Sequence, residues 1–221
     1  GKNGINTSYG KNQIGTFYQP KIVYIDPGIL SSLSKRELKS GFSEIIKHSL
    51  IYDERFFKWL EKNDQSILEL NLHNLTKAIY KSVIIKKNYV LNDEKEKLSN
   101  INSRAILNFG HTFGHALETY YNFNKKLTHG EAISIGMTVA SKLSNKLNHL
   151  SNKDYLKIIN IFKKNKLPTF DKKMYDKKIF EIIKKDKKNI NGEINCILLK
   201  KIGSAFIKPK LNINSISKII N

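Results

Sequence analysis

Cysteine is almost absent from this chain of 221 residues, since Cys196 is the only one. A single cysteine excludes a disulfide within the chain and fits a reducing compartment. The sequence also lacks any run of about 18 apolar residues, which a membrane-spanning helix would need. We therefore expect a cytoplasmic protein that does not act at a membrane.

Arginine is the second scarce residue type. The chain has 36 lysines but only three arginines, and its formal net charge is +20. Basic proteins often bind nucleic acids, but surfaces that read bases favour the two-pronged guanidinium group of arginine. The lysines are also spread along the chain rather than gathered in one block. We therefore predict that nucleic acid is not the partner, and we keep a non-catalytic basic helical binding module as an alternative only.

The spacing of apolar residues predicts a mainly helical fold with little β-structure. The expected helices cover 34–51, 53–62, 71–91, 103–121, 128–147, 153–165 and 175–188, with one last helical turn in 211–221. Ser34 and Thr128, each followed by a glutamate three residues later, predict capped helix starts. Residues 194–199 and 205–208, joined through Gly203, predict a small C-terminal β-hairpin.

The first 30 residues differ in character from the rest. Residues 1–19 are rich in glycine and predict a loop, whose Lys2, Lys11 and Asn12 suit an anionic group such as a phosphate. Residues 21–26 predict a short buried strand, for which the sequence offers no partner strand nearby. Because the chain also opens directly on the glycine-rich stretch, we expect a fragment or the processed C-terminal part of a longer protein.

A stripe of polar side chains on the helix predicted at 103–121 is the strongest sign of function. At about 100° per residue, its members fall within roughly 80° of one another. They are Arg104, Asn108, His111, His115 and Glu118. An amphipathic helix normally carries apolar residues on such a face. We therefore expect this face to form the wall of an active site.

The histidines allow two metal-binding arrangements. A catalytic zinc site needs three protein ligands, which His111 and His129 with one carboxylate would supply. His111 and His115, one helical turn apart, have a ligand spacing of their own. Spacing alone does not choose between these pairs, and core histidines without a metal are the third interpretation.

Charged residues elsewhere in the chain add to the predicted site. Glu44 lies in a largely apolar part of a helix, three residues before Lys47, so we expect its carboxylate to be buried and held by a partner. Lys47, Lys86 and Arg104 would make the site electropositive. Such a site suits an anionic substrate, whose carboxylate or phosphate an arginine can hold through two hydrogen bonds.

Five segments resemble the 3-dehydroquinate synthase family, in the family's order and with near-family spacing. They are GKNGIN with GKNQIGTFYQP, GFSEIIKHSLI, IKKNYVLNDEKE, NFGHTFGHALE with LTHGEAISIGM, and KKDKKNINGEI. The resemblance implies that residues 31–221 form the helical metal- and substrate-binding domain of that fold. It implies that residues 1–30 belong to an N-terminal NAD-binding domain that is largely absent, whose sheet would take the short strand.

The resemblance also implies an activity. Members of the family convert 3-deoxy-arabino-heptulosonate 7-phosphate to 3-dehydroquinate and phosphate, a lyase step of the shikimate pathway to aromatic amino acids. The implied cofactors are NAD and a divalent metal, zinc or cobalt, and the implied assembly of the complete enzyme is a homodimer. Because most of the NAD site belongs to the N-terminal domain, we expect these 221 residues to be inactive alone. A related sugar-phosphate cyclase is the alternative.

Motif positions imply separate roles for the residues of the polar stripe and their neighbours. Glu44, His111 and His129 match the metal ligands, which decides between the two histidine pairs. His115 matches a histidine of the substrate pocket, in the region of phosphate binding and proton transfer. The positions that match the substrate-binding set are Lys47, Lys86, Arg104 and Asn108.

The remaining matches lie near the two ends of the chain and before Arg104. Those near the phosphate and the cofactor are Lys2, Lys11 and Asn12. A late substrate-binding lysine matches Lys187, with Lys188 as the alternative, and Glu96 is a weaker match. The stretch between Glu96 and Arg104 is a few residues longer than is usual in the family, so we expect a loop that bulges before Arg104.

Overall fold

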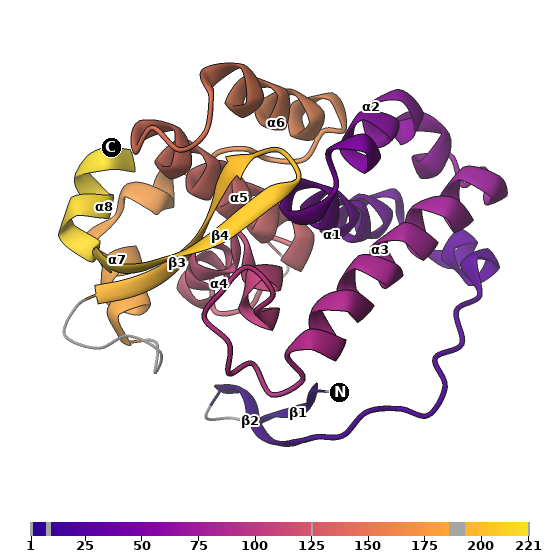
Figure 1. Cartoon of the computed structure of the whole chain (residues 1–221), viewed down its shortest axis with the longest axis horizontal. Helices are drawn as coiled ribbons and strands as arrows, with labels where there is room; N and C mark the ends of the chain where they lie inside the picture. The colour runs from indigo at the N-terminus through magenta and orange to yellow at the C-terminus, as the bar shows by residue number, and fades with distance from the viewer. Residues whose placement is uncertain (1, 8–9, 125, 186–192, 221) are drawn as a thin grey trace.

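The computed structural model describes residues 2–7, 10–124, 126–185 and 193–220, and it is mainly helical (Figure 1). The α-helices are α1 (Lys35–Tyr52), α2 (Glu54–Leu68), α3 (Leu72–Asn92), α4 (His111–Tyr120), α5 (His129–Lys146), α6 (Asn152–Lys164), α7 (Lys177–Lys185) and α8 (Ile213–Ile220). Shorter 3₁₀ helices are η1 (Pro27–Ser32), η2 (Arg104–Asn108) and η3 (Lys172–Tyr175). The strands form two antiparallel pairs, β1 (Lys2–Thr7) with β2 (Gly10–Phe17) and β3 (Glu193–Lys201) with β4 (Ser204–Asn212). The predicted helical fold with a C-terminal hairpin is thereby confirmed.

Helix α5 runs through the middle of the helical part. It packs against α1, α4 and α6, and β3 of the β3–β4 hairpin lies against it (Figure 1). Its buried side chains are mostly small or aliphatic, among them Ala132, Ile133 and Ala140. Burial of an aliphatic side chain the size of isoleucine contributes roughly 2 kcal/mol, so these contacts fix α5 firmly against α1 and α4.

Two helices begin with the caps that the sequence predicts. The hydroxyls of Ser34 and Thr128 accept hydrogen bonds from the backbone N–H groups of Glu37 and Glu131. Each glutamate in turn accepts a hydrogen bond from the backbone of its cap residue. These capping boxes fix where α1 and α5 begin, and they put His129 in the first turn of α5.

Glycines permit a close approach between α5 and the start of α4. A Cβ atom on Gly136 would lie 2.1 Å from the carbonyl oxygen of Gly110, so only glycine fits there. Gly110 itself has a φ of 79°, in the left-handed region that favours glycine, and the chain turns there from η2 into α4. The position of His111 therefore depends on both glycines.

The helix predicted at 103–121 is in fact two helices. The positive φ of Gly110 interrupts it, so that a short 3₁₀ helix ends before α4 begins at His111. Angles counted along one continuous helix do not hold across this break, and the prediction of a single polar stripe is wrong. His111, His115 and Glu118 do share one face of α4, whereas the two stripe members on η2 belong to a separate element.

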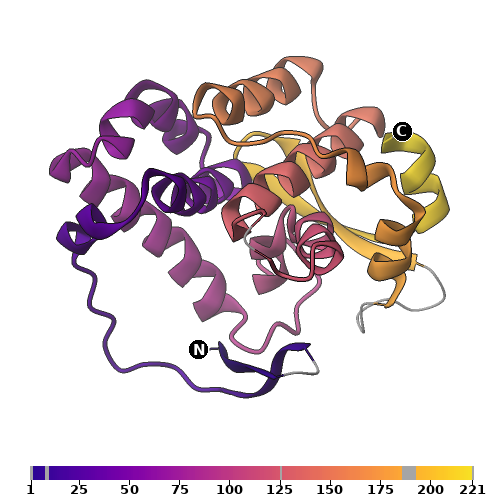
Figure 2. The same cartoon turned by 180° about the vertical axis from the view of Figure 1, so that it is seen from behind.

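The N-terminal predictions also need correction. Residues 1–19 contain the β1–β2 hairpin rather than a loop, with Ile5 opposite Ile14 across the pair. Residues 21–26 are not a strand, and Tyr24 among them is 95% exposed. A strand needs a neighbour for its backbone groups, and none of the described residues pairs with this segment. Figures 1 and 2 show it as a long connection between β2 and η1, apart from the helices.

Candidate metal and substrate site

Side chains from three helices converge at one point. Glu44 comes from α1, and His111 and His129 are the first residues of α4 and α5. Oε1 of Glu44 lies 3.7 Å from Nε2 of His111 and 3.6 Å from Nε2 of His129. The centroids of the two imidazole rings are 5.6 Å apart. Two ring nitrogens and one carboxylate oxygen thus face a common centre.

This donor set fits a divalent metal ion. Oε1 of Glu44 is buried and has no hydrogen-bond partner among the described residues, which is costly for a carboxylate oxygen unless a ligand binds it. Two tetrahedral ligands of zinc, each about 2.1 Å from the ion, lie about 3.4 Å apart, close to both distances here. Imidazole nitrogen and carboxylate oxygen both suit zinc, and three protein ligands leave a position open for substrate or water.

The second nitrogen of each ring is engaged elsewhere. Nδ1 of His111 lies 3.2 Å from the carbonyl oxygen of Phe109, and Nδ1 of His129 lies 3.1 Å from Oε1 of Glu118. Both partners can only accept a hydrogen bond. We therefore assign the proton of each neutral ring to Nδ1, which leaves the lone pair on Nε2 at the common centre.

Lys47 holds the other oxygen of Glu44. Its Nζ lies 2.5 Å from Oε2, and the lysine side chain is buried. Burial favours a raised pKa for Glu44, but the interactions with His129 and with Lys47 outweigh it and hold the pKa well below its usual range. Burial also lowers the pKa of Lys47, against the opposing effect of Glu44. The carboxylate is therefore ionised, with one oxygen fixed by the lysine and the other turned to the histidines.

The two histidines at the common centre differ in basicity. Burial, together with the charge of Lys47, lowers the pKa of His111 to about 3. The hydrogen bond to Glu118, together with the nearby negative charge of Glu44, raises the pKa of His129 to about 9. At neutral pH a metal ion must therefore displace a proton from His129, whereas His111 is already neutral.

His115 lies beside this cluster. It follows His111 by one turn, with 5.1 Å between the ring centroids, and its side chain is 53% exposed. Its Nε2 lies 4.0 Å from Oε2 of Glu118, beyond hydrogen-bond distance. His115, Glu118 and His129 form a second group of potential ligands, which shares His129 with the first.

Arg104 and Asn108 are tied to the polar loop that follows α3. Arg104 is buried, and its NH1 donates a hydrogen bond of 2.7 Å to the carbonyl oxygen of Glu94. Nδ2 of Asn108 donates to Oε1 of Glu96 at 3.2 Å. Helix η2, which carries both side chains, packs against α1 and α3. Glu96, which matched the family only weakly, thus contacts Asn108 of the predicted site.

Asp93 organises that loop and is missing from the predicted site residues. Its buried carboxylate accepts hydrogen bonds from the backbone N–H groups of Lys97, Leu98 and Arg104, and from the hydroxyl of Ser103. Burial favours a raised pKa for Asp93, but these hydrogen bonds hold it below its usual value. The sequence does contain a signal for this role, because Asp93 is an acidic residue just after the end of the helix predicted at 71–91, where backbone N–H groups of the following loop need acceptors.

Lys86 and a buried histidine connect α3 to the same region. Lys86 is exposed on α3. Burial is the main cause of the lowered pKa values of Lys47 and His48, and the positive charge of Lys86 adds to the lowering of both. His48, also missing from the predicted residues, is buried, and its Nδ1 contacts the hydroxyl of Ser82 on α3. Burial, with the charge of Lys47, lowers the pKa of His48 to about 3. This contact fixes α1 against α3.

Some predicted site residues, or their side chains, lie outside the part of the chain that the structure describes. Lys187 and Lys188 lie outside the described residues, as does the end of the helix predicted at 175–188. Lys2 lies in β1, and Lys11 and Asn12 lie in β2, but the side chains of these three residues lie outside what the structure describes. The predicted cofactor and late substrate contacts therefore stay predictions.

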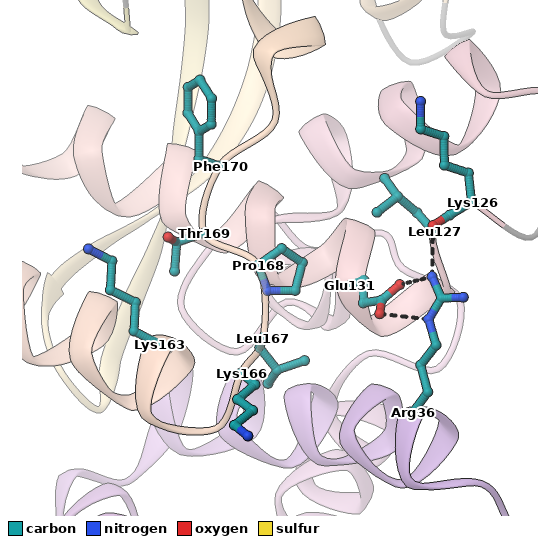
Figure 3. Close-up of a pocket in the computed structure, with 10 residues that line it drawn as sticks. All are labelled: Arg36, Lys126, Leu127, Glu131, Lys163, Lys166, Leu167, Pro168, Thr169 and Phe170. Atoms are coloured by element: carbon teal, nitrogen blue, oxygen red, sulfur yellow. Dashed lines mark hydrogen bonds and ion pairs between the residues drawn. The ribbon is translucent and has the colours of Figure 1, made fainter.

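A cavity of about 580 Å³ lies away from the histidines, between the starts of α1 and α5 and the segment after α6 (Figure 3). Its wall contains Arg36, which binds Glu131 through two hydrogen bonds of 2.8 and 2.6 Å. The lysines around it, Lys126, Lys163 and Lys166, point away from one another in Figure 3. None of the predicted site residues lines this cavity.

Within the described residues, no helix combines the length and the apolar character that crossing a bilayer requires.

Families and relatives of known sequence match nearly the whole chain. The family described as 3-dehydroquinate synthase C-terminal matches residues 41–189, and the one described as 3-dehydroquinate synthase N-terminal matches residues 1–40. A 3-dehydroquinate synthase of Pelagibacter ubique (strain HTCC1062) is 43% identical over 222 residues, which cover 98% of this chain and 59% of that protein. The chain thus spans about three-fifths of the length of this relative.

Solved structures share the fold. The 2-epi-5-epi-valiolone synthase ValA of Streptomyces hygroscopicus subsp. jinggangensis 5008, with NAD⁺ and Zn²⁺ bound, matches 99% of this chain and 60% of its own, with a TM-score of 0.84 and 24% identity. A 2-deoxy-scyllo-inosose synthase complexed with carbaglucose-6-phosphate, NAD⁺ and Co²⁺ matches the same shares, with a TM-score of 0.68 and 27% identity. These likenesses support the fold, and the family matches extend over two consecutive segments of the sequence. The chain belongs to the 3-dehydroquinate synthase family.

Proposed function

We propose that this chain forms the metal- and substrate-binding part of a 3-dehydroquinate synthase, which converts 3-deoxy-arabino-heptulosonate 7-phosphate to 3-dehydroquinate and phosphate. The convergence of Glu44, His111 and His129 from three helices is the observation that carries the proposal. The similarity to a synthase of that name supports the choice of reaction.

NAD and a divalent metal ion are the proposed cofactors, with zinc or cobalt as the ion. The two related structures contain NAD⁺ with Zn²⁺ or Co²⁺, and Glu44, His111 and His129 offer a donor set that suits either ion. When bound, NAD takes up and returns a hydride, and the ion polarises a substrate hydroxyl.

The chain's own residues supply charge and proton transfer. Lys47 keeps Glu44 ionised and turned toward the histidines, so the site offers one negative charge to a cation. We assign proton transfer to His115, because it is half-exposed and one turn from His111. Elimination of phosphate also needs cations for the leaving group. We assign binding of the substrate's carboxylate and phosphate to Lys47, Lys86, Arg104, Asn108 and Lys187.

We propose that residues 31–221 form the metal- and substrate-binding domain and that residues 1–30 belong to the NAD-binding domain. The two family matches divide at residue 40, inside α1. However, α1 packs as a whole against α2, α3 and α5, which favours a boundary before its cap at Ser34. The homodimer rests on the family resemblance alone, whereas the cytoplasmic location is inferred from the single cysteine, which fits a reducing compartment.

A related sugar-phosphate cyclase is the second candidate function. The two solved structures that share the fold carry the names of such enzymes. The 43% identity to a 3-dehydroquinate synthase, against 24% and 27% to these structures, favours the first candidate.

Phosphate release measured in a steady-state assay tests the reaction. We expect no turnover by the 221 residues alone, and turnover of 3-deoxy-arabino-heptulosonate 7-phosphate when the chain is fused behind the N-terminal domain of the Pelagibacter relative. In this fusion, Arg104→Ala should lower kcat/KM about 10- to 100-fold, because hydrogen bonds to a charged substrate group are lost.

The same assay contains the results that would contradict the proposal. Turnover by the isolated chain at the rate of a full-length synthase would disprove its inactivity. A fusion that releases phosphate from glucose 6-phosphate, but not from the heptulosonate, would favour the second candidate.

A further inference from the structure

Glu118 is a buried carboxylate next to the proposed metal ligands. It lies in α4, about two turns after His111, and its side chain is 9% exposed. A buried carboxylate is unfavourable unless donors satisfy it. Its Oε1 lies 3.1 Å from Nδ1 of His129, within hydrogen-bond distance. This contact joins α4 to the first turn of α5.

The contact completes a pattern that both histidines share. Each ring gives Nδ1 to an acceptor, the Phe109 carbonyl oxygen for His111 and the Glu118 carboxylate for His129. Each ring then turns Nε2 toward Oε1 of Glu44. An acceptor behind a metal-bound histidine fixes the tautomer and the ring orientation, and it makes the ligand nitrogen more basic.

The second group of potential ligands offers a competing arrangement. There, His115, Glu118 and His129 would bind the ion, and His129 would use Nδ1 in place of Nε2. The 3.1 Å contact is a hydrogen bond in which Nδ1–H donates to the carboxylate, so this nitrogen has no lone pair for a metal. His115 is also half-exposed and lies 4.0 Å from Glu118, farther than either histidine lies from Glu44.

We propose that Glu118 is a positioning residue of the metal site. By accepting the Nδ1 proton of His129 it turns Nε2 toward Glu44, so that one ion binds between Glu44, His111 and His129, and His115 is left for the substrate. The proposal deepens the proposed function and rests on its metal site.

Zinc affinity of the 221-residue chain, measured by competition with a chromophoric chelator, tests the proposal. Glu118→Ala should weaken zinc binding about 10- to 100-fold, the usual effect of losing such an acceptor. Glu118→Gln keeps an acceptor oxygen and the volume, and should give an intermediate affinity. Tyr120→Phe is the matched control, because it removes a hydrogen bond of the same helix, to Asp176, and should leave the affinity within about twofold.

Two further variants separate this inference from the proposed function. His111→Ala should abolish tight zinc binding, whereas His115→Ala should leave it within about twofold. If His115→Ala lost as much zinc affinity as His111→Ala, the assignment of the ion to Glu44, His111 and His129 would be overturned. If the unaltered chain binds no zinc, the metal part of the proposed function fails. If it binds zinc and folded Glu118→Ala binds equally well, only the role of Glu118 fails.

The unaltered, zinc-loaded chain gives a test that does not depend on a variant folding. Long-range ¹H–¹⁵N correlation spectra of histidine report which ring nitrogen carries the proton. We expect His129 to be protonated at Nδ1 and metal-bound at Nε2. A metal-bound Nδ1 in His129 would overturn the proposal.

Discussion

Lys47 is a buried cation whose partner, Glu44, is also a proposed metal ligand. The lysine fixes one carboxylate oxygen, and this explains why the other is turned to the histidines. The sequence predicted the closeness of these two residues from their i,i+3 spacing, and it predicted that the carboxylate is buried. Neither spacing nor composition could predict the contact of His48, because its partner Ser82 lies 34 positions away along the chain.

Replacing Lys47 tests the ion pair. We expect Lys47→Met to lower the free energy of unfolding by about 2 kcal/mol in the presence of a chelator, because the charge of Glu44 loses its partner. The effect stays below that of a fully buried pair, since the Glu44 side chain is 28% exposed. Urea unfolding followed by circular dichroism measures it. Lys86→Met, at an exposed lysine, should change stability by less than about 0.5 kcal/mol, and an equal effect of both variants would contradict the account.

The buried His48 predicts a pH dependence of stability. Its pKa falls from 6.5 to about 3 on folding, so between these values the unfolded chain binds a proton that the folded chain does not. This contribution to stability is present above pH 6.5 and is lost as the pH falls toward 3. Between pH 7 and pH 5 we expect the free energy of unfolding of the unaltered chain to fall by about 2 kcal/mol more than that of the His48→Asn variant. Parallel pH profiles of the two proteins in urea unfolding would refute this.

At the scale of secondary-structure elements, the ends of α4 and α5 decide the geometry of the site. The capping box of α5 was readable from the sequence, because Thr128 and Glu131 have a local spacing with a known structure. The break before α4 was not, since a lone glycine is compatible with a helix until packing requires a positive φ. Here Gly110 meets Gly136 of α5, which no local pattern contains.

Adding one methyl group at this contact tests its importance. A Cβ on Gly136 would lie 2.1 Å from the backbone of Gly110, so Gly136→Ala must push α5 away from α4. We expect a loss of about 3 kcal/mol in the free energy of unfolding and a weaker zinc affinity, since His111 and His129 move apart. Gly41→Ala is the control, because a Cβ there meets nothing within 4 Å, and a helical alanine should stabilise the chain by about 0.5 to 1 kcal/mol. Equal stability of both variants would contradict the account.

At the scale of the whole molecule, the helical part and the N-terminal segment differ in how they are held. The described apolar side chains that are buried between Phe42 and Ile220 form one core, whereas the side chains of Ile22, Val23 and Tyr24 are exposed. The apolar run of residues 21–26 predicted a short buried strand, and this prediction is wrong. Local sequence could not reveal the error, because a strand depends on hydrogen bonds to a second segment, which an apolar run does not specify.

Limited proteolysis tests this division. Chymotrypsin should cut first at Tyr18 or Tyr24, because both are exposed and neither lies in a strand of the part of the chain that the structure describes. The larger product keeps all three proposed metal ligands and should bind zinc as tightly as the whole chain. Mass spectrometry of the early products identifies the sites, and a first cut inside α1–α5 would contradict the proposed boundary at residue 30.

Anomalous scattering at the zinc edge, recorded from a crystal of the zinc-loaded chain, tests the central claim most directly. The account predicts one strong peak, bound by Oε1 of Glu44 and by Nε2 of His111 and His129. A peak between His115, Glu118 and His129, or none near these helices, would contradict it.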